Sequence, residues 1–324
     1  MKISKKAREI FASAEERYSR LAAEVSAKIK PAVESQDWFF IHRVKTLESF
    51  ALKLETGRID NPLEPDDFYA CTIVVSTQSE IETAERLIES FYTPQFRKPE
   101  RDDDTHKEAS SFVFDDLRLY VTRGESAGRE NADLEGLLFE IQIKTILQYA
   151  WGRATHDLIY KTDSVSWPKE RIAFQVKAML EHAELAIADA NNLSRSSAIA
   201  KKDRKTSSVL KIIDQIERIW PSDALPEDRR RLAENVRQAL AIANIKDADR
   251  LTGLVEAEIR RVGLLPRDLS PYAFVVQALA QAHDIELERK LNAGGKGKIL
   301  VHSAMELPDW MRGVHPRIIN LDAL

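Results

Sequence analysis

Apolar and polar residues alternate strictly in the segment FEIQIK, residues 139–144, and this pattern predicts a β-strand. The odd-numbered positions are Phe and Ile, while the even-numbered positions are Glu140, Gln142 and Lys144. Side chains of a strand alternate between its two faces, so one face would enter a core and the other would carry the three polar groups. A solvent-facing edge is the simplest explanation when these six residues are taken alone.

The other periodic segments predict helices around one strand-rich region. A period near 3.6 predicts two long helices, at residues 4–34 and 168–199. Strands alternating with helices between them favour an α/β or α+β domain with a mixed sheet. The expected strands lie at 70–76, at 110–123 as a hairpin turning at Asp115 and Asp116, and at 137–144, and the expected helices at 43–55, 78–91 and 145–159.

The composition along the chain predicts two domains. Residues 1–198 form the first, a polar and basic stretch at 199–208 is the expected linker, and residues 209–324 form a mostly helical C-terminal region. One short strand, KILVHS, is expected near the end of that region.

Overall composition is that of an ordinary globular protein. The net charge is -4 and the pI about 6.1, so bulk charge does not indicate a nucleic-acid or membrane binder. The single cysteine, Cys71, lies in the apolar run ACTIVV, which favours a buried reduced thiol and a cytoplasmic location. No apolar run reaches the ~20 residues that span a bilayer, so no membrane partner is expected.

A row of cations precedes the first expected strand. Lys45, Ser49 and Lys53 are spaced four residues apart on the helix expected at 43–55, and Arg43 lies just upstream. Cations and a hydroxyl along one stripe suit a polyphosphate, because each can contact a different phosphoryl oxygen. A solvated helix face is the alternative.

Carboxylates mark two of the expected strands. Asp66 and Asp67 stand just before the apolar strand 70–76, and Glu140 lies on the strand described first. Carboxylate oxygens are ligands for hard cations such as Mg²⁺, although a turn aspartate is the simpler explanation for Asp67 alone. Together, Asp67, Glu140 and the cationic row predict metal-assisted phosphoryl transfer.

At residues 37–165 the chain resembles the RelA/SpoT-type alarmone synthetases. Three motifs occur in the family's order: R-x-K-x-x-x-S-x-x-x-K, then D-[LF]-x-[GA]-x-R, then E-I-Q-I-[RK]-T followed by H-x-x-x-Y-K. The matching residues are Arg43, Lys45, Ser49 and Lys53, then Asp67, Phe68 and Ala70, then Glu140, Gln142, Lys144, Thr145, His156, Tyr160 and Lys161. The resemblance implies an α+β fold: a mixed β-sheet, nucleotidyltransferase-like domain flanked by helices and followed here by the mostly helical region.

The resemblance also implies an activity and its residues. The expected reaction is Mg²⁺-dependent transfer of pyrophosphate from ATP to the ribose 3′-hydroxyl of GDP or GTP, which makes the alarmone (p)ppGpp. Asp67 and Glu140 would be the catalytic residues and the metal ligands. The ATP-binding residues would be Arg43, Lys45, Ser49 and Lys53, and the acceptor-binding residues Lys98, Lys107, Gln142, Lys144, His156 and Lys161.

The sequence departs from the family pattern at two positions that contact the nucleotide bases in the family. Thr72 stands where the family has an arginine that packs by the adenine, and Ser111 where it has a tyrosine that stacks on guanine. A base stack contributes roughly 1–3 kcal/mol, so the pattern suggests retained chemistry with altered base choice. Two alternatives therefore stay open: a toxin-type relative that pyrophosphorylates adenine nucleotides or the tRNA 3′ end, and a catalytically degenerate nucleotide-sensing module. The oligomeric state, a homo-oligomer included, and a regulatory partner for the C-terminal region are also open.

Overall fold

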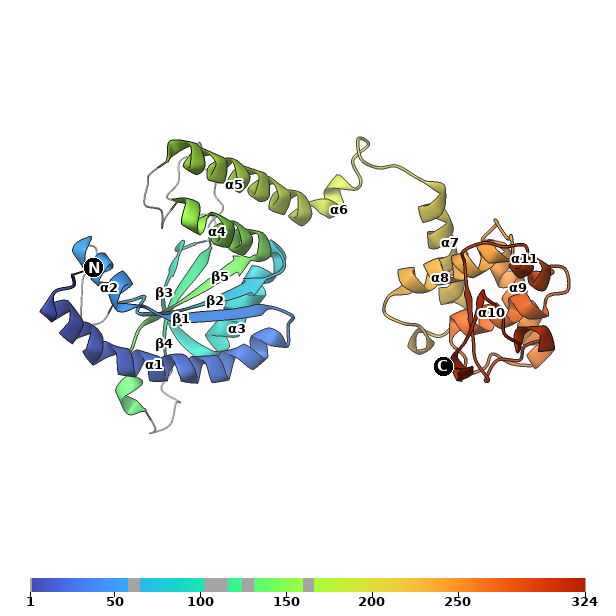
Figure 1. The fold of residues 1–324 in the computed structure, drawn as a ribbon, viewed down its shortest axis with the longest axis horizontal. Coiled ribbons are helices and arrows are strands. Elements are labelled where there is room, and N and C mark those ends of the chain that lie inside the picture. Colours follow the sequence, from blue (N-terminus) through green and yellow to red (C-terminus); the bar gives the residue numbers. More distant parts are fainter. Residues whose placement is uncertain (1, 58–64, 102–115, 124–130, 160–165, 324) are drawn as a thin grey trace. The chain divides into compact units, whose positions relative to one another are not determined.

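The computed structural model divides the chain into two compact units, unit 1 (Met1–Ile199) and unit 2 (Ala200–Leu324), which Figure 1 shows in sequence colours. Each unit is described by itself. The residues that the structure describes are 2–57, 65–101, 116–123, 131–159 and 166–323, without the side chains of 157–159.

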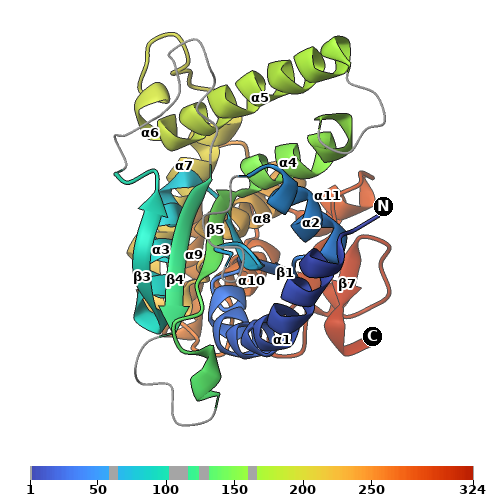
Figure 2. The ribbon, with the colours of Figure 1, turned by 90° about the vertical axis from the view of Figure 1, so that its left-hand side faces the viewer.

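Unit 1 is built on a mixed sheet of five strands in the order β1-β2-β5-β4-β3. β2 and β5 are parallel, whereas the other neighbouring pairs are antiparallel. Figure 2 shows β3 at one edge of this sheet. The predicted α+β fold with a mixed sheet and flanking helices is confirmed. The strands are β1 (Phe39–Val44), β2 (Tyr69–Val75), β3 (Tyr92–Lys98), β4 (Leu117–Arg123) and β5 (Phe139–Thr145).

One face of the sheet is the core of unit 1. Phe139, Ile141 and Ile143 on β5 are fully buried, as their alternation predicts. They join one hydrophobic cluster with residues of α1 (Lys5–Glu34) and α3 (Ile81–Phe91). α1 begins where the Ser4 side chain caps it by accepting from the Ala7 N–H. The second face of the sheet, which carries the even-numbered residues of β5, is called the site face below.

The predicted helix at 43–55 is corrected by the structure. The run Phe39–Val44 is a strand paired with β2, and α2 spans only Leu47–Glu55. Aromatic and β-branched residues favour a strand there, and Thr46 then caps α2 by accepting from the Ser49 N–H. Arg43 is therefore a strand residue and not the start of a helix.

The predicted hairpin at 110–123 is also changed. β4 pairs antiparallel with β3, a strand that the sequence pattern did not predict. Residues 102–115, which include the expected turn residue Asp115, lie outside the described residues.

Two helices follow β5, and they lie side by side in Figures 1 and 2. α4 spans Ile146–Ile159, and α5 spans Trp167–Ala188, which is shorter than the predicted 168–199. A short helix, α6 (Ala190–Leu193), follows. α5 buries Lys177 and Glu184 while Trp167 and Met179 are exposed, the reverse of an ordinary surface helix. Within the described residues no helix is long and apolar enough to cross a membrane.

Unit 2 is mostly helical, as predicted, with one small sheet. Its two strands, β6 (Ile299–Val301) and β7 (Ile318–Asn320), pair in parallel. β6 lies in the predicted KILVHS strand, whereas β7 was not predicted. The helices are α7 (Arg204–Ile219), which begins inside the stretch expected as a linker, α8 (Arg229–Ile242), α9 (Arg250–Val262), α10 (Pro271–Gln281) and α11 (Leu287–Asn292).

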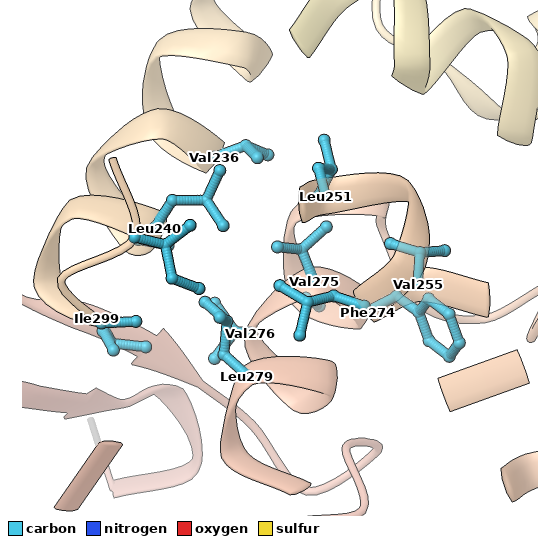
Figure 3. Packing of buried hydrophobic residues seen from close by; sticks show 14 of the residues in the cluster. Val236, Leu240, Leu251, Val255, Phe274, Val275, Val276, Leu279 and Ile299 are labelled. Carbon is cyan, nitrogen blue, oxygen red and sulfur yellow. The ribbon is translucent and has the colours of Figure 1, made fainter. Parts of the chain in front are cut away.

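The core of unit 2 centres on α10. Figure 3 shows Val275, Val276 and Leu279 of α10 meeting side chains of α8, α9 and β6. Phe274 is buried and lies edge-on to the Trp220 ring, with ring centroids 6.4 Å apart. The aromatic residues of this region thus fill its own core.

We expect Phe274→Ala to destabilise unit 2 by about 3–5 kcal/mol, because a buried ring leaves a cavity when it is removed. Amide hydrogen exchange across α9 and α10 reports this local free energy. Leu264→Ala, at a side chain that is 65% exposed in the same unit, is the control and should change it by less than about 0.5 kcal/mol. Equal exchange in the two variants would contradict the packing described here.

Candidate functional site

The site face collects the polar residues of three adjacent strands. Glu140 on β5 is opposite Ala70 of β2 and Tyr120 of β4. Gln142 is opposite Thr72 and Arg118 in the next row of the same face. Residues directly opposite each other share a face, so these side chains project together. Glu140 is only 4% exposed, which excludes a solvent-facing edge at this position.

Both carboxylate oxygens of Glu140 have partners on the site face. The Tyr120 hydroxyl donates to Oε2 at 3.3 Å, and the Gln142 amide nitrogen donates to Oε1. The Arg118 guanidinium Nε lies 3.9 Å from Oε1. Burial, and then the charge of Glu140, raise the pKa of Tyr120, so the phenol stays protonated and acts as a donor. Glu140 is thus held in one orientation by its strand neighbours.

A second cluster joins α2 to the start of β2. The Lys45 ammonium lies 2.6 Å from Asp67 Oδ2, and the Lys53 ammonium lies 2.7 Å from the same oxygen and 3.3 Å from Asp66. The backbone N–H of Lys45 donates to the Phe68 carbonyl at 2.8 Å, and this hydrogen bond holds the backbone of Lys45 next to that of Asp67 and Phe68. The structure therefore brings together two predicted ATP residues and a predicted metal ligand.

The charges of this cluster are mutually dependent. Burial raises the pKa of Asp67, but hydrogen bonds from Lys45 and Lys53 outweigh it and hold that pKa below its ordinary value. Burial lowers the pKa of Lys45, and Asp67 only partly offsets this. Burial also acts on Lys53, but Asp67 and Asp66 together raise its pKa. Asp67 is thus an ionised carboxylate between two ammonium groups.

One oxygen of Asp67 suits a metal ion. Oδ1 is buried and has no hydrogen-bond partner among the described residues. Mg²⁺ is often held by one or two carboxylates together with substrate phosphates, so the donor set fits this ion. Among the described residues no three His, Cys, Asp or Glu side chains gather around one position. Asp67 lies in the turn before β2, three residues ahead of Ala70, the strand partner of Glu140.

The remaining predicted ATP residues lie apart from the Asp67 contacts. Arg43 is exposed on β1 opposite Ala70, so it continues the row that contains Glu140. The Ser49 hydroxyl accepts from the Thr46 hydroxyl at 3.1 Å at the start of α2.

The predicted acceptor residues are only partly brought together. Lys144 lies 3.6 Å from Asp116 Oδ2, and Lys98 on β3 lies opposite Arg118. His156 is half-buried on α4. Lys107, Ser111, Tyr160 and Lys161 lie outside the described residues.

Four residues near this face were missed by the sequence analysis. Arg118 and Tyr120 alternate with apolar residues of β4, as Gln142 and Glu140 do on β5. This two-residue period could have indicated from the sequence that both strands direct polar side chains to one face. Asp116, predicted as a turn residue, lies 3.1 Å from Arg118. Phe96 stacks on Tyr120 with ring centroids 4.2 Å apart and is 41% exposed, and the Lys98 ammonium lies 5.2 Å from the Tyr120 ring.

An apolar cavity of about 670 Å³ lies at the β1 edge of the sheet. Phe39, Ile41 and Val74 line it from β1 and β2, and Ile146 and Tyr149 line it from α4. The side chains of Phe39, Ile41 and Ile146 are exposed.

Arg43 lies near the apolar cavity along β1. Ile41, which lines the cavity, is opposite Thr72, and Arg43 is two residues further along the strand, about 6.6 Å away. The cavity and one of the predicted ATP-binding cations therefore lie on the same edge strand.

Unit 1 is thus an α+β domain whose site face carries the buried Glu140 carboxylate and the exposed Phe96 ring, with the cluster of Asp67, Lys45 and Lys53 beside the start of β2. Residues 42–165 match the family model described as "Region found in RelA / SpoT proteins". The chain therefore contains a RelA/SpoT-type domain at these residues, and the resemblance carried by the motifs is confirmed there. No curated protein matches the chain.

Solved structures of synthetases are similar to unit 1 at low identity. Small alarmone synthetase 1 from Bacillus subtilis is 18% identical, with a TM-score of 0.46, and the match covers 59% of this chain and 99% of that one. The same synthetase bound to its product pppGpp is 16% identical, with a TM-score of 0.45, covering 60% and 100%. A GTP pyrophosphokinase family protein from Streptococcus pneumoniae is 17% identical, with a TM-score of 0.45, covering 62% and 100%.

The lowered pKa of Asp67 predicts how stability depends on pH. Such a group stabilises the fold above its unfolded pKa of about 3.9, and this stabilisation is lost as the pH falls through the folded pKa. The free energy of unfolding of the wild type, minus that of Asp67→Asn, should rise with pH up to about pH 4 and be constant above about pH 5. Urea unfolding between pH 2.5 and 6, followed by tryptophan fluorescence, measures it. A difference that falls with rising pH would contradict the two-lysine environment.

Proposed function

We propose that unit 1 is a Mg²⁺-dependent pyrophosphokinase that transfers pyrophosphate from ATP to the ribose 3′-hydroxyl of a guanosine nucleotide. The observation that carries this proposal lies within the RelA/SpoT-type region: a buried, oriented Glu140 on β5, together with the Asp67 carboxylate and its two lysines just before the neighbouring strand β2. The product would be the alarmone (p)ppGpp.

Glu140 accepts the proton of the attacking hydroxyl in this proposal. A general base must be held within hydrogen-bond reach of the proton that it removes. Tyr120 and Gln142 each donate to one oxygen of Glu140, which leaves its remaining lone pairs to face a substrate. Attack of the 3′-hydroxyl on the β-phosphorus forms the new O–P bond and expels AMP.

Arg43, Lys45 and Lys53 neutralise the charge of the ATP phosphates. Charge stabilisation and positioning supply most of the catalysis in phosphoryl transfer. Lys45 and Lys53 already converge on one oxygen, so their ammonium groups lie close enough to contact one polyphosphate. Ser49 adds a hydroxyl at the start of α2.

Asp67 and Glu140 are the proposed holders of Mg²⁺. The buried Oδ1 atom of Asp67, which has no hydrogen-bond partner in the described chain, supports this role. When bound, the ion would supply Lewis-acid polarisation of the phosphoryl oxygens. Lys45 and Lys53 hold the second oxygen of Asp67 and so direct Oδ1 away from themselves.

The apolar cavity is the proposed place of the adenine. Ligand sites are mostly apolar hollows of about 300–1,000 Å³ with few polar groups, and this cavity has such a size and lining. It adjoins Arg43, so a base within it would have its phosphates directed at the cations. Thr72 is short, and an arginine in its place would project from the same face between Ile41 and Gln142. The missing arginine and the open apolar hollow thus belong to one change in base recognition.

The acceptor side is proposed to lie over β3 and β4. Phe96 exposes an aromatic ring beside Tyr120, and Lys98 lies over both rings, which suits a nucleotide with a base and phosphates. Lys144, Gln142 and His156 would complete this side. An adenine nucleotide or the tRNA 3′ end is the second candidate acceptor, favoured by Ser111 where the family has the tyrosine that stacks on guanine, and by the additional helical region.

We expect Glu140→Gln to lower the rate of pyrophosphate transfer by about 10²–10⁴-fold, because the amide cannot accept the hydroxyl proton. Purified protein is incubated with γ-labelled ATP, Mg²⁺ and GDP, GTP, ATP or tRNA, and labelled product is separated and counted. Glu82→Gln is the matched control, at an exposed residue of α3 paired with Arg86, and should keep the wild-type rate.

The outcomes of this assay separate the three hypotheses. A labelled product formed from GDP or GTP supports alarmone synthesis. A labelled product formed only from ATP as the acceptor, or from tRNA, supports the second acceptor class. No label on any acceptor, together with nucleotide binding in calorimetry, would leave a nucleotide-sensing module. Equal rates for the wild type and Glu140→Gln would refute the assigned base.

Phe39→Ala should raise the KM for ATP about fivefold to a hundredfold, because a base contact of this kind contributes about 1–3 kcal/mol. The kcat at saturating ATP should not change, since Phe39 is remote from the transferred group. Phe174→Ala, at another exposed phenylalanine of unit 1, is the control and should leave the KM unchanged. An unchanged KM in Phe39→Ala would show that the adenine lies elsewhere.

We propose a cytoplasmic location for this reaction, since a chain with a single cysteine forms no internal disulfide, which fits a reducing compartment. Cys71 is buried, and burial raises the pKa of its thiol, so the thiol stays protonated. A homo-oligomer and a regulatory partner for unit 2 stay predictions.

A further inference from the structure

A second cavity lies in unit 2, and none of the residues that line it has a role in the function proposed above. It has a volume of about 420 Å³ and is bounded by the start of α7, the last turns of α8 and the segment after α8. Its floor is apolar and includes the buried Leu240 and Ile245. The α7 and α8 helices that form its walls share one hydrophobic core, so the cavity has a rigid base.

Four cations line this cavity, and they are called the basic quartet here: Arg204, Lys205, Arg237 and Lys246. Ser208 and Asn244 supply a hydroxyl and an amide. None of the residues that line the cavity, all of them within the described part of unit 2, carries a carboxylate. The quartet is notable because the chain as a whole has a net charge of -4.

The side chains of the basic quartet lack protein partners among the residues that the structure describes. The Nε atom of Arg237 is buried and has no hydrogen-bond acceptor. A buried donor without an acceptor costs about 1–3 kcal/mol, and more when it is charged. Four like charges around one hollow also repel each other. An anion in the cavity would remove both costs.

The carboxylates closest in sequence to Arg204, Lys205 and Lys246 are already engaged elsewhere. Asp203 caps α7 by accepting from the N–H groups of Lys205 and Thr206. Asp249 pairs with Lys211 at 2.9 Å, and Asp247 accepts from the Asp249 N–H. The dipole of α8 places only about half an elementary negative charge at its C-terminal end, which is much less than the positive charge of the four cations. The protein itself therefore does not neutralise these cations.

We propose that the cavity of unit 2 binds a small phosphate-bearing ligand through the basic quartet. Phosphate oxygens accept charge-assisted hydrogen bonds from guanidinium and ammonium groups. The lining residues include no aromatic ring, so recognition is of the phosphate groups and not of a stacked base. The hollow shape favours a small anion over an extended nucleic acid, which binds along grooves and stripes.

Inorganic pyrophosphate is the probe for the test, with the full chain and hydrogen exchange as the local readout. Pyrophosphate should slow exchange in peptides that cover residues 204–212 and 237–248. The protection should weaken as salt increases, because exposed charge pairs are screened. This readout is separate from any binding of the probe at the site face of unit 1, whose peptides are resolved independently.

Two variants and one control make the test specific. Arg237→Gln and, separately, Lys246→Gln should each weaken the affinity measured from this protection by about tenfold or more. Lys246 is exposed, so its variant keeps the fold even if Arg237→Gln does not. Lys211→Gln, which removes a paired cation of the same unit outside the cavity, should leave the affinity unchanged. Full protection in both quartet variants, or protection by single-stranded RNA but not by pyrophosphate, would overturn the proposal.

Discussion

The parallel pairing of β2 with β5 places the parts of the site face, because its register sets Ala70 opposite Glu140 and Thr72 opposite Gln142. A slip of one residue would turn every side chain of a strand to the opposite face. The buried Phe139, Ile141 and Ile143 oppose such a slip, since exposing each would cost about 1.5–3 kcal/mol. The apolar side of β5 therefore fixes the register of the strand, and Tyr120 and Gln142 then orient Glu140 on the site face.

The charges on this face are balanced before any nucleotide arrives. Asp67 lies between Lys45 and Lys53, and Arg118 lies between Asp116 and Glu140. Under the proposed reaction, Lys45 and Lys53 would contact the polyphosphate while they hold Oδ2 of Asp67, and Oδ1 would be left for a divalent cation. Asp67 would then have a counterion both with and without the nucleotide, which avoids the large cost of a buried charge without one.

The elements with a clear period were predictable, and those fixed by distant partners were not. The alternation in FEIQIK predicted β5 and its polar row, and the helical period predicted α1 within one residue at its start. The strand β1 was missed because its run is short and its pairing with β2 cannot be read from the sequence, although its aromatic and β-branched residues do favour a strand. The same holds for β3 and for the Phe96–Tyr120 stack, which joins residues far apart in the sequence. The cationic row was recognised, but its placement on a helix alone was wrong, since Arg43 comes from a strand and Lys45 from the turn before α2.

The separation of the two hydrophobic cores has a consequence for how the chain is made. The main hydrophobic cluster of unit 1 extends from Phe11 to Ile143, and that of unit 2 begins at Val209. A ribosome adds about 5–20 residues per second, so the stretch between the two cores takes on the order of several seconds to synthesise. The first core can therefore close before the second begins to emerge, and apolar segments of the two units are kept apart in time during synthesis.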